Sequence, residues 1–164
     1  MKRSRHLRLI PALAALLLAA PLAASAASDT DFLKKAMQGD NSEMKLGKIA
    51  AERGASPGVR SFGRTLEADH AKAKQEALPV ARRHGLKPTD AMAPEARKEQ
   101  GKLSALSGAA FDREFARYMV EDHKKDISDF ERQVRHGDPS TARLARQTLP
   151  ALRKHLRMAQ ALAR

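Results

Sequence analysis

The sequence predicts an all-α protein, a bundle of four long helices with one short helix in a crossover. No segment alternates polar and apolar residues with the period of two that marks a half-buried strand. Apolar residues instead recur at steps of three and four along several long segments, which is the spacing of a buried helix face. The 164-residue chain contains no cysteine, so a packed core must stabilise it without disulfides.

The first 26 residues have the pattern of a secretory signal peptide. Basic residues at positions 2, 3, 5 and 8 precede an apolar run over 9–22, and Ala24-Ser25-Ala26 is a small-residue cleavage pattern. The run is shorter than the roughly 20 residues that a bilayer span needs. We therefore expect cleavage near Ala26 and a mature domain of residues 27–164 without a transmembrane segment. This domain would lie in the periplasm or at the outer membrane.

Capping residues, prolines and glycines mark the expected helix ends. A first helix begins at Ser28 or Thr30, and the five predicted helices cover about 30–53, 57–84, 94–106, 109–136 and 139 to near the C-terminus. Ser56-Pro57 and Asp138-Pro139 each place a cap residue before a proline at the first helical position. The short connections at these two dipeptides predict two antiparallel hairpins, and the longer connection, with its short helix, is a crossover between them.

The chain is strongly basic. It has 31 Lys and Arg against 19 Asp and Glu, a net charge of +12, and the loss of four basic residues with the signal leaves +8. Such an excess suits anionic envelope components, lipid or lipopolysaccharide, and export makes nucleic acid an unsuitable partner. The charges are scattered rather than clustered, so a solvated surface without a dedicated polyanion site is the alternative interpretation.

An internal repeat links the second and third long helices. The segments 62–72 and 115–125 match at an offset of 53 residues, with Phe, Arg, Leu or Met, Asp, His and Lys in the same places. This agreement indicates either two related hairpins or two halves of one symmetrical site.

Four polar residues lie on predicted inward faces, one on each long helix. His70 and His123 fall within the apolar stripes of their helices at about 100° per residue, and His155 and Glu43 lie near the other two stripes. Three imidazoles and a carboxylate in a bundle core could hold iron, zinc or copper. Asp69 and Asp122, beside the two repeat histidines, could act as ligands or orient a neighbouring ring.

Other interpretations of these residues stay open. The histidines could form a metal-free polar layer that pairs with carboxylates, and Met119 or Met158 could add a thioether that favours copper(I) or could simply fill the core. No thiol nucleophile, phosphate-binding loop, zincin pair or nucleophile elbow is found in the sequence, which favours a binding protein over an enzyme. A metal-dependent redox enzyme is a further alternative and requires an open coordination position.

The mature chain resembles the bacterial domain-of-unknown-function family 4142. The matching segments span residues 30–162: Glu43-Met-Lys-Leu-Gly-Lys-Ile-Ala50, Val59-Arg-Ser-Phe62, Asp69-His70, Ser107-Gly108-Ala-Ala-Phe111-Asp112, Asp122-His123, Phe130-Glu131, Leu149-Pro150 and His155-Leu156. The resemblance implies a ferritin-like four-helix bundle and an exported location, without a reaction.

A ferritin-like bundle permits a comparison with di-iron proteins, which carry two Glu-x-x-His motifs. Glu67-Ala-Asp-His70 fits one motif, but Val120 stands where the second motif needs its glutamate. We therefore expect a mononuclear site or none, rather than a di-iron centre.

Overall fold

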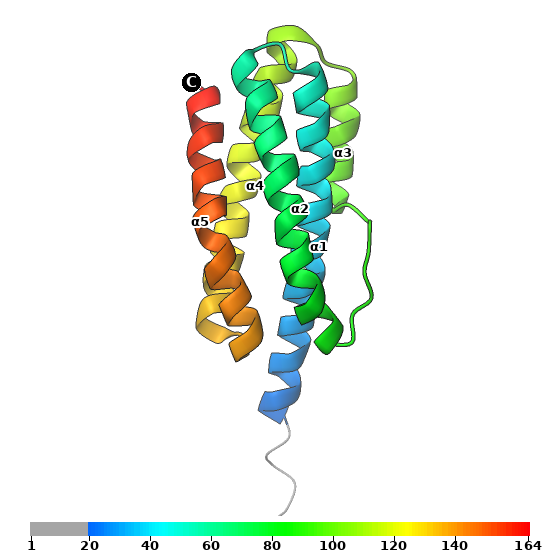
Figure 1. Ribbon diagram of the computed structural model, residues 1–164, viewed down its shortest axis with the longest axis vertical. Coiled ribbons are helices and arrows are strands. Elements are labelled where there is room, and N and C mark those ends of the chain that lie inside the picture. The colour runs from blue at the N-terminus through cyan, green and yellow to red at the C-terminus, as the bar shows by residue number, and fades with distance from the viewer. Residues whose placement is uncertain (1–19) are drawn as a thin grey trace, which may run out of the picture.

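A computed structural model describes the backbone of residues 20–164 and the side chains from residue 28 onward. In that part of the chain the fold is all-α, as predicted, with five helices and no strand: α1 (Ala20–Arg53), α2 (Pro57–Arg83), α3 (Pro94–Ser104), α4 (Gly108–His136) and α5 (Pro139–Leu162). Figure 1 shows the four long helices side by side as a bundle, with the short α3 against α1. No helix in residues 20–164 combines the length and apolar character needed to cross a bilayer.

The predicted caps form as expected at two helix starts. The Ser56 hydroxyl accepts a hydrogen bond from the Val59 amide, and the Asp138 carboxylate accepts from the amides of Ser140 and Thr141. Gly85 follows α2 with a φ of +73°, a backbone conformation that glycine adopts without strain.

The first helix differs from its prediction. α1 begins at Ala20, before the expected caps Ser28 and Thr30. The alanine-rich residues just before Ser28 favour helix strongly, and this preference outweighs the capping tendency of Ser28. Residues 1–19, which include most of the predicted signal peptide, lie outside the described residues, so its cleavage stays a prediction.

The two hairpins pack closely, α1 on α2 and α4 on α5, and further contacts join α2 to α5 and α1 to α4. α1 and α2 approach closely at Gly47 and Gly63. A Cβ added at Gly47 would lie 2.7 Å from the Gly63 carbonyl oxygen, so the two backbones leave no room for a side chain there.

The apolar core is divided into two clusters along the bundle. One cluster contains Leu46, Phe62, Leu66, Phe115 and Met119, and the other contains residues nearer the opposite end, such as Phe32, Met37, Val80 and Leu144. Glu43 and His70 each lie along their helices between residues of the two clusters. The candidate site is thus a polar layer between two apolar ones.

The first part of the crossover, between α2 and α3, is attached to α1 by two buried side chains. The Asn41 amide donates to the carbonyl oxygens of Thr89 (2.8 Å) and Ala91 (3.1 Å), and the Ser42 hydroxyl accepts from the Ala93 amide (2.9 Å). These contacts lie next to Glu43 in sequence. They hold the start of α3 beside the part of α1 that carries the site.

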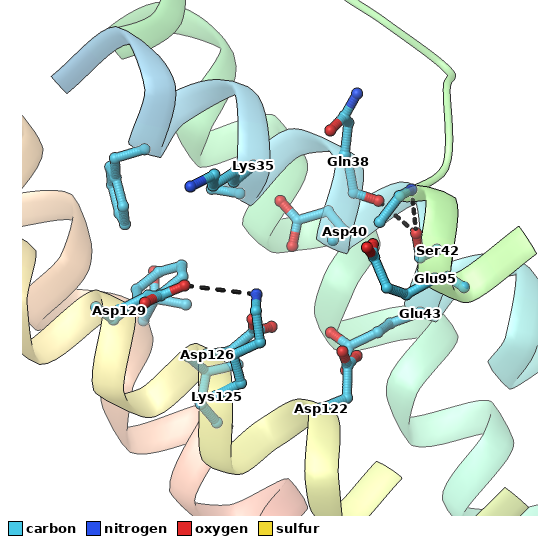
Figure 2. A pocket seen from close by; sticks show the side chains of 18 of the residues that line it. Lys35, Gln38, Asp40, Ser42, Glu43, Glu95, Asp122, Lys125, Asp126 and Asp129 are labelled. Carbon is cyan, nitrogen blue, oxygen red and sulfur yellow. Dashed lines mark hydrogen bonds and ion pairs between the residues drawn. The ribbon is translucent and has the colours of Figure 1, made fainter. Parts of the chain in front are cut away.

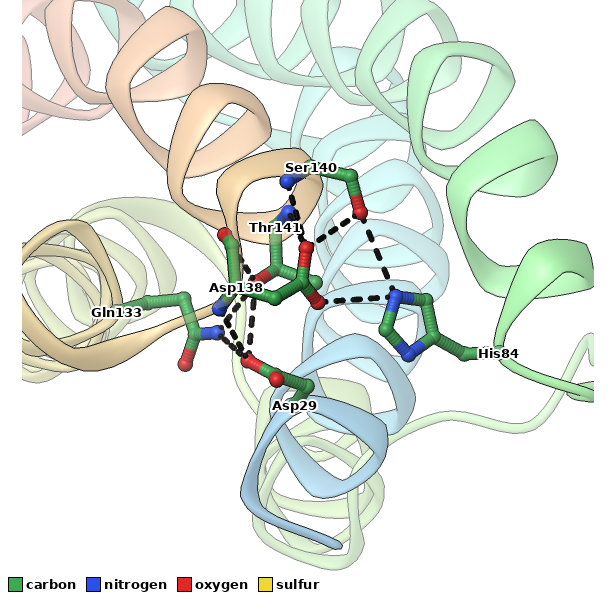
Figure 3. Close-up of polar contacts among 6 residues, drawn as sticks. All are labelled: Asp29, His84, Gln133, Asp138, Ser140 and Thr141. Atoms are coloured by element: carbon green, nitrogen blue, oxygen red, sulfur yellow. Dashed lines mark hydrogen bonds and ion pairs between the residues drawn. The ribbon is translucent and has the colours of Figure 1, made fainter. Parts of the chain in front are cut away.

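A polar network at the end of the bundle opposite α3 joins all four long helices (Figure 3). The buried Asp29 carboxylate of α1 accepts hydrogen bonds from Gln133 on α4 and Thr141 on α5. The His84 ring at the end of α2 contacts the Asp138 carboxylate at 3.1 Å. Capping and hydrogen bonding explain these side chains, so the network is structural.

Candidate metal centre

Each of the four long helices supplies one buried polar side chain to the middle of the bundle. Glu43 comes from α1, His70 from α2, His123 from α4 and His155 from α5, and none is more than 3% exposed. Their positions follow from helical periodicity, since Phe62, Leu66 and His70 are successive inward residues of α2. The structure therefore brings together all four residues that the sequence placed on inward faces.

The three imidazole rings face one another. The ring centroids of His70 and His155 are 5.2 Å apart, those of His123 and His155 are 5.3 Å apart, and those of His70 and His123 are 6.1 Å apart. One ring nitrogen from each histidine lies within 4.8 Å of the other two. Since metal–nitrogen bonds are about 2 Å long, a single ion between the rings could reach all three nitrogens.

The outer nitrogen of each ring is held by an oxygen acceptor. His70 Nδ1 lies 3.0 Å from Asp40 Oδ1, and His123 Nδ1 lies 2.9 Å from the Met119 carbonyl oxygen. His155 Nε2 lies 2.9 Å from Asp69 Oδ2. Because carbonyl and carboxylate oxygens accept hydrogen bonds, these outer nitrogens carry the protons in the neutral rings.

The inner nitrogens are therefore acceptors that face a carboxylate. His70 Nε2 lies 2.7 Å from Glu43 Oε2 and His123 Nε2 lies 3.2 Å from Glu43 Oε1. Neither contact has hydrogen-bond geometry, and His155 Nδ1 and both Glu43 oxygens are also buried without a hydrogen-bond partner. Buried acceptors that face each other repel and require a proton or a cation between them.

In the metal-free protein a proton on His70 fills this role at the shorter of the two contacts. Burial alone would raise the pKa of Glu43, but the facing His123 and His70 outweigh it and lower the pKa to about 2. Burial opposes charge on His70 as well, yet Glu43 and Asp40 raise its pKa well above 6.5. Burial lowers the pKa of His123, and it lowers that of His155 to about 4. Glu43 is thus ionised and His70 protonated, and the two form a buried ion pair with 2.7 Å between Nε2 and Oε2.

Glu43 also borders a cleft of about 810 Å³ between α1, the start of α3 and α4 (Figure 2). One oxygen each of Glu43, Asp122 and Asp126 lie within 4.8 Å of one another. Burial and the Glu43 charge raise the pKa of Asp122 to about 7, and burial and Asp122 raise that of Asp126 well above 3.8. Glu43 therefore belongs to two groups, a histidine group in the core and a carboxylate group in the cleft.

The two aspartates predicted to orient the rings have different positions. Asp69 contacts a histidine, but it is His155 of α5 and not its neighbour His70. Asp122 is hydrogen-bonded to none of the three rings and faces Glu43 and Asp126 instead. An aspartate adjacent in sequence to a histidine lies about 100° away on the helix, so it reaches the next helix rather than the neighbouring ring.

Sequence reasoning missed Asp40, the Met119 carbonyl and Asp126. Asp40 precedes Glu43 by three residues and Asp126 follows Asp122 by four, so helical spacing could have placed each on the right face. The Met119 carbonyl carries no side-chain signal. The Met119 side chain and Met158 pack in or against the apolar core, which agrees with their interpretation as core filler.

Comparisons with known proteins agree with the fold and supply no activity. A family model described as "Domain of unknown function (DUF4142)" matches residues 15–162. A solved structure titled "Crystal structure of DUF305 fragment from Deinococcus radiodurans" is similar with a TM-score of 0.72 and 22% sequence identity, and the match covers 83% of this chain and 95% of that chain. At this identity the likeness shows a shared helical fold alone. No curated protein matched the chain.

Proposed function

The chain belongs to the DUF4142 family, a domain of unknown function, and we propose that it is a non-enzymatic metal-binding bundle. It would hold one transition-metal ion between the three buried histidines and Glu43. The observation that carries this proposal is the arrangement of protons. Each ring gives one proton outward to an oxygen acceptor, and the inner nitrogens of His70 and His123 face the buried carboxylate of Glu43.

This arrangement matches the way proteins prepare histidines for metal. Metal-binding histidines donate their second N–H to a carboxylate or a backbone carbonyl, which fixes the ring and its tautomer. Asp40, Asp69 and the Met119 carbonyl supply these three acceptors here. A metal-free polar layer needs no such repeated orientation of all three rings.

The donor set favours zinc, cobalt, iron(II) or copper(II) over copper(I). Three imidazole nitrogens and one carboxylate oxygen are intermediate to hard ligands, whereas copper(I) prefers sulfur. The side chains of Met119 and Met158 instead pack in or against the apolar core. Glu43 would fill the fourth position of a tetrahedral site, and a closed four-coordinate site is typical of a binding or structural role rather than catalysis.

We further propose a ferritin-like arrangement of the bundle and export of the mature domain. Two hairpins, α1–α2 and α4–α5, joined by a crossover that contains α3, support the first proposal. The signal-like sequence of residues 1–26 supports the second. Expression of the full chain in a Gram-negative host tests export, with a periplasmic product that begins at Ala27 as the expected result. A cytoplasmic product that retains Met1 would contradict it.

Cobalt titration tests the metal centre. The full chain is stripped with chelator, and Co²⁺ binding is followed by the visible absorption of tetrahedral Co²⁺ and by thermal stability. We expect one ion per chain, and a loss of affinity of at least about tenfold in His70→Gln and His123→Gln. His136→Gln is the matched control, because His136 is exposed and lies at the end of α4. Absent Co²⁺ binding, or equal binding by all variants, contradicts the proposal.

A metal-free polar layer is the second candidate function of these residues. It is favoured by the 2.7 Å ion pair between His70 and Glu43, which a proton on His70 satisfies. In that case His70→Gln lowers the free energy of unfolding and added metal stabilises neither protein. Binding to anionic lipid or lipopolysaccharide rests on net charge alone and stays a prediction.

A further inference from the structure

The carboxylate group in the cleft is built from two helices that face each other. Glu43 comes from α1, and Asp122 and Asp126 come from adjacent turns of α4. Figure 2 shows Asp122 beneath Glu43, with Asp126 one turn further along α4. One carboxylate oxygen from each lies within 4.8 Å of the others. A cation between them could therefore contact all three, since metal–oxygen bonds are about 2.0–2.6 Å long.

Protonated His70 offsets the charge of Glu43 alone, and the ion pairs of the described residues include neither Asp122 nor Asp126. Both oxygens of the buried Glu43 lack a hydrogen-bond partner, and no Lys or Arg of the described residues forms an ion pair with Asp122 or Asp126. Asp129, one turn further along the same cleft wall, pairs with both Lys125 and Arg132. On this wall of α4, Asp129 is thus ion-paired, whereas Asp122 and Asp126, which lie close to Glu43, are not.

The charge of the cleft is opposite to that of the protein. Seven Asp and Glu side chains line it against three Lys and Arg, although the chain as a whole carries +12. A cleft lined mainly by one sign of charge concentrates ions of the other sign. Lys125 stands at this wall with an exposed side chain, and its ammonium group points to Asp129 at 3.5 Å.

We propose that Glu43, Asp122 and Asp126 form a second cation site, for a hard divalent ion such as Mn²⁺. This inference rests on the proposed function in one respect: Glu43 would give one oxygen to each site. Three carboxylates without nitrogen or sulfur donors suit Mg²⁺, Ca²⁺ or Mn²⁺ rather than the ions that prefer imidazole. Glu43 and His70 both border the cleft, so the second site lies on the route from solvent to the histidine centre.

Mn²⁺ titration followed by electron paramagnetic resonance tests this site, because bound Mn²⁺ loses the sharp signal of the free ion. The full metal-free chain is expected to bind one Mn²⁺ ion. The double variant Asp122→Asn/Asp126→Asn should bind it at least about tenfold more weakly, since two charged ligands become neutral amides. Asp129→Asn is the matched control on the same cleft wall and should stay within about twofold of the parent chain.

The variant His155→Gln separates this site from the histidine centre, because His155 does not line the cleft and pairs with Asp69. It should lose Co²⁺ affinity and keep Mn²⁺ affinity. Absent Mn²⁺ binding by the parent chain, or equal binding by the double variant, overturns the second site and leaves the cobalt result intact. Mn²⁺ binding without any Co²⁺ binding supports the second site and contradicts the proposed function. The single variant Asp126→Asn repeats the test if the double variant does not fold.

Discussion

The two copies of the repeat, residues 62–72 in α2 and 115–125 in α4, agree on their inner faces and differ on their edges. Phe62 and Phe115 are fully buried, with ring centroids 6.0 Å apart, and His70 and His123 both face Glu43. The edge positions differ. Asp69 pairs with His155 on α5, whereas the matched Asp122 faces the carboxylates of the cleft.

This difference shows what a helical repeat determines. The period of 3.6 residues fixes which side chains point into the bundle, so matched inner residues share one environment. An edge residue contacts whichever helix is adjacent. α2 packs against α5, where Asp69 contacts His155, and α4 borders the cleft that Asp122 lines.

The largest effect is expected from truncation of the matched phenylalanines. Phe62→Ala and Phe115→Ala should each lower the free energy of unfolding by roughly 3–5 kcal/mol, because each removes a fully buried ring from one shared core. Urea denaturation of the metal-free proteins measures both. If only one of the two variants loses stability, the inner faces of the two copies are not equivalent. The milder Phe62→Leu and Phe115→Leu variants repeat the comparison if either alanine variant does not fold.

A smaller effect is expected one residue later, where the copies have Gly63 and Ala116. Gly63→Ala should destabilise the fold by roughly 1–3 kcal/mol, because its Cβ would lie 2.6 Å from the Ala51 amide nitrogen and push α1 away from α2. The reciprocal Ala116→Gly should cost about 1 kcal/mol through helix propensity. If both substitutions cost the same, close packing of α1 on α2 is not what distinguishes the two copies.

The matched aspartates should differ in their effect on Co²⁺ binding. Asp69→Asn weakens the acceptor that orients His155, and a loss of 10- to 100-fold in affinity is expected. Asp122→Asn should change Co²⁺ affinity less than about threefold, because Asp122 is hydrogen-bonded to no ring. Competition with a chelator of known affinity gives both constants. Equal losses would show that the edges are as alike as the inner faces.

The smallest effect concerns α3, which packs beside Glu114, the residue just before the second copy. Burial and the nearby Glu114 raise the pKa of Glu99 to about 7, so the folded state holds a proton there between about pH 4.5 and 7 that the unfolded state releases. Stability should fall as pH rises through that window, by roughly 1 kcal/mol, because solvent around the exposed Lys102 and Arg117 side chains screens the charges and reduces the effect of the shift. Glu99→Gln should remove this pH dependence in urea denaturation at pH 5 and pH 8. If the free energy of unfolding of Glu99→Gln changes with pH as it does in the parent chain, another group causes the pH dependence.

Much of the fold could be predicted from the sequence because its punctuation is local. Ser56-Pro57, Gly85 and Asp138-Pro139 lie at the helix ends that they predicted, since capping depends on neighbouring residues only. The predicted start of α1 was wrong, because the helix extends through the alanine-rich segment before Ser28.

The candidate site could be predicted in part for the same reason. Periodicity alone placed Glu43 and the three histidines in the core, and the structure brings them into contact. It could not show that His155 lies at the same level as the other rings, because relative helix position is set by packing across the bundle. Periodicity also could not predict that Asp69 contacts His155 of α5 or that Asp126 lies near Glu43. Those contacts depend on which helices are neighbours.

Crystals of the chain loaded with Co²⁺ or Zn²⁺ test the central claim most directly. Anomalous diffraction at the absorption edge of the metal should show one strong peak about 2.0–2.1 Å from one ring nitrogen each of His70, His123 and His155, with a Glu43 oxygen at a similar distance. Bound metal that lies only at surface residues, with His70 still paired to Glu43 as in the metal-free protein, would contradict the account.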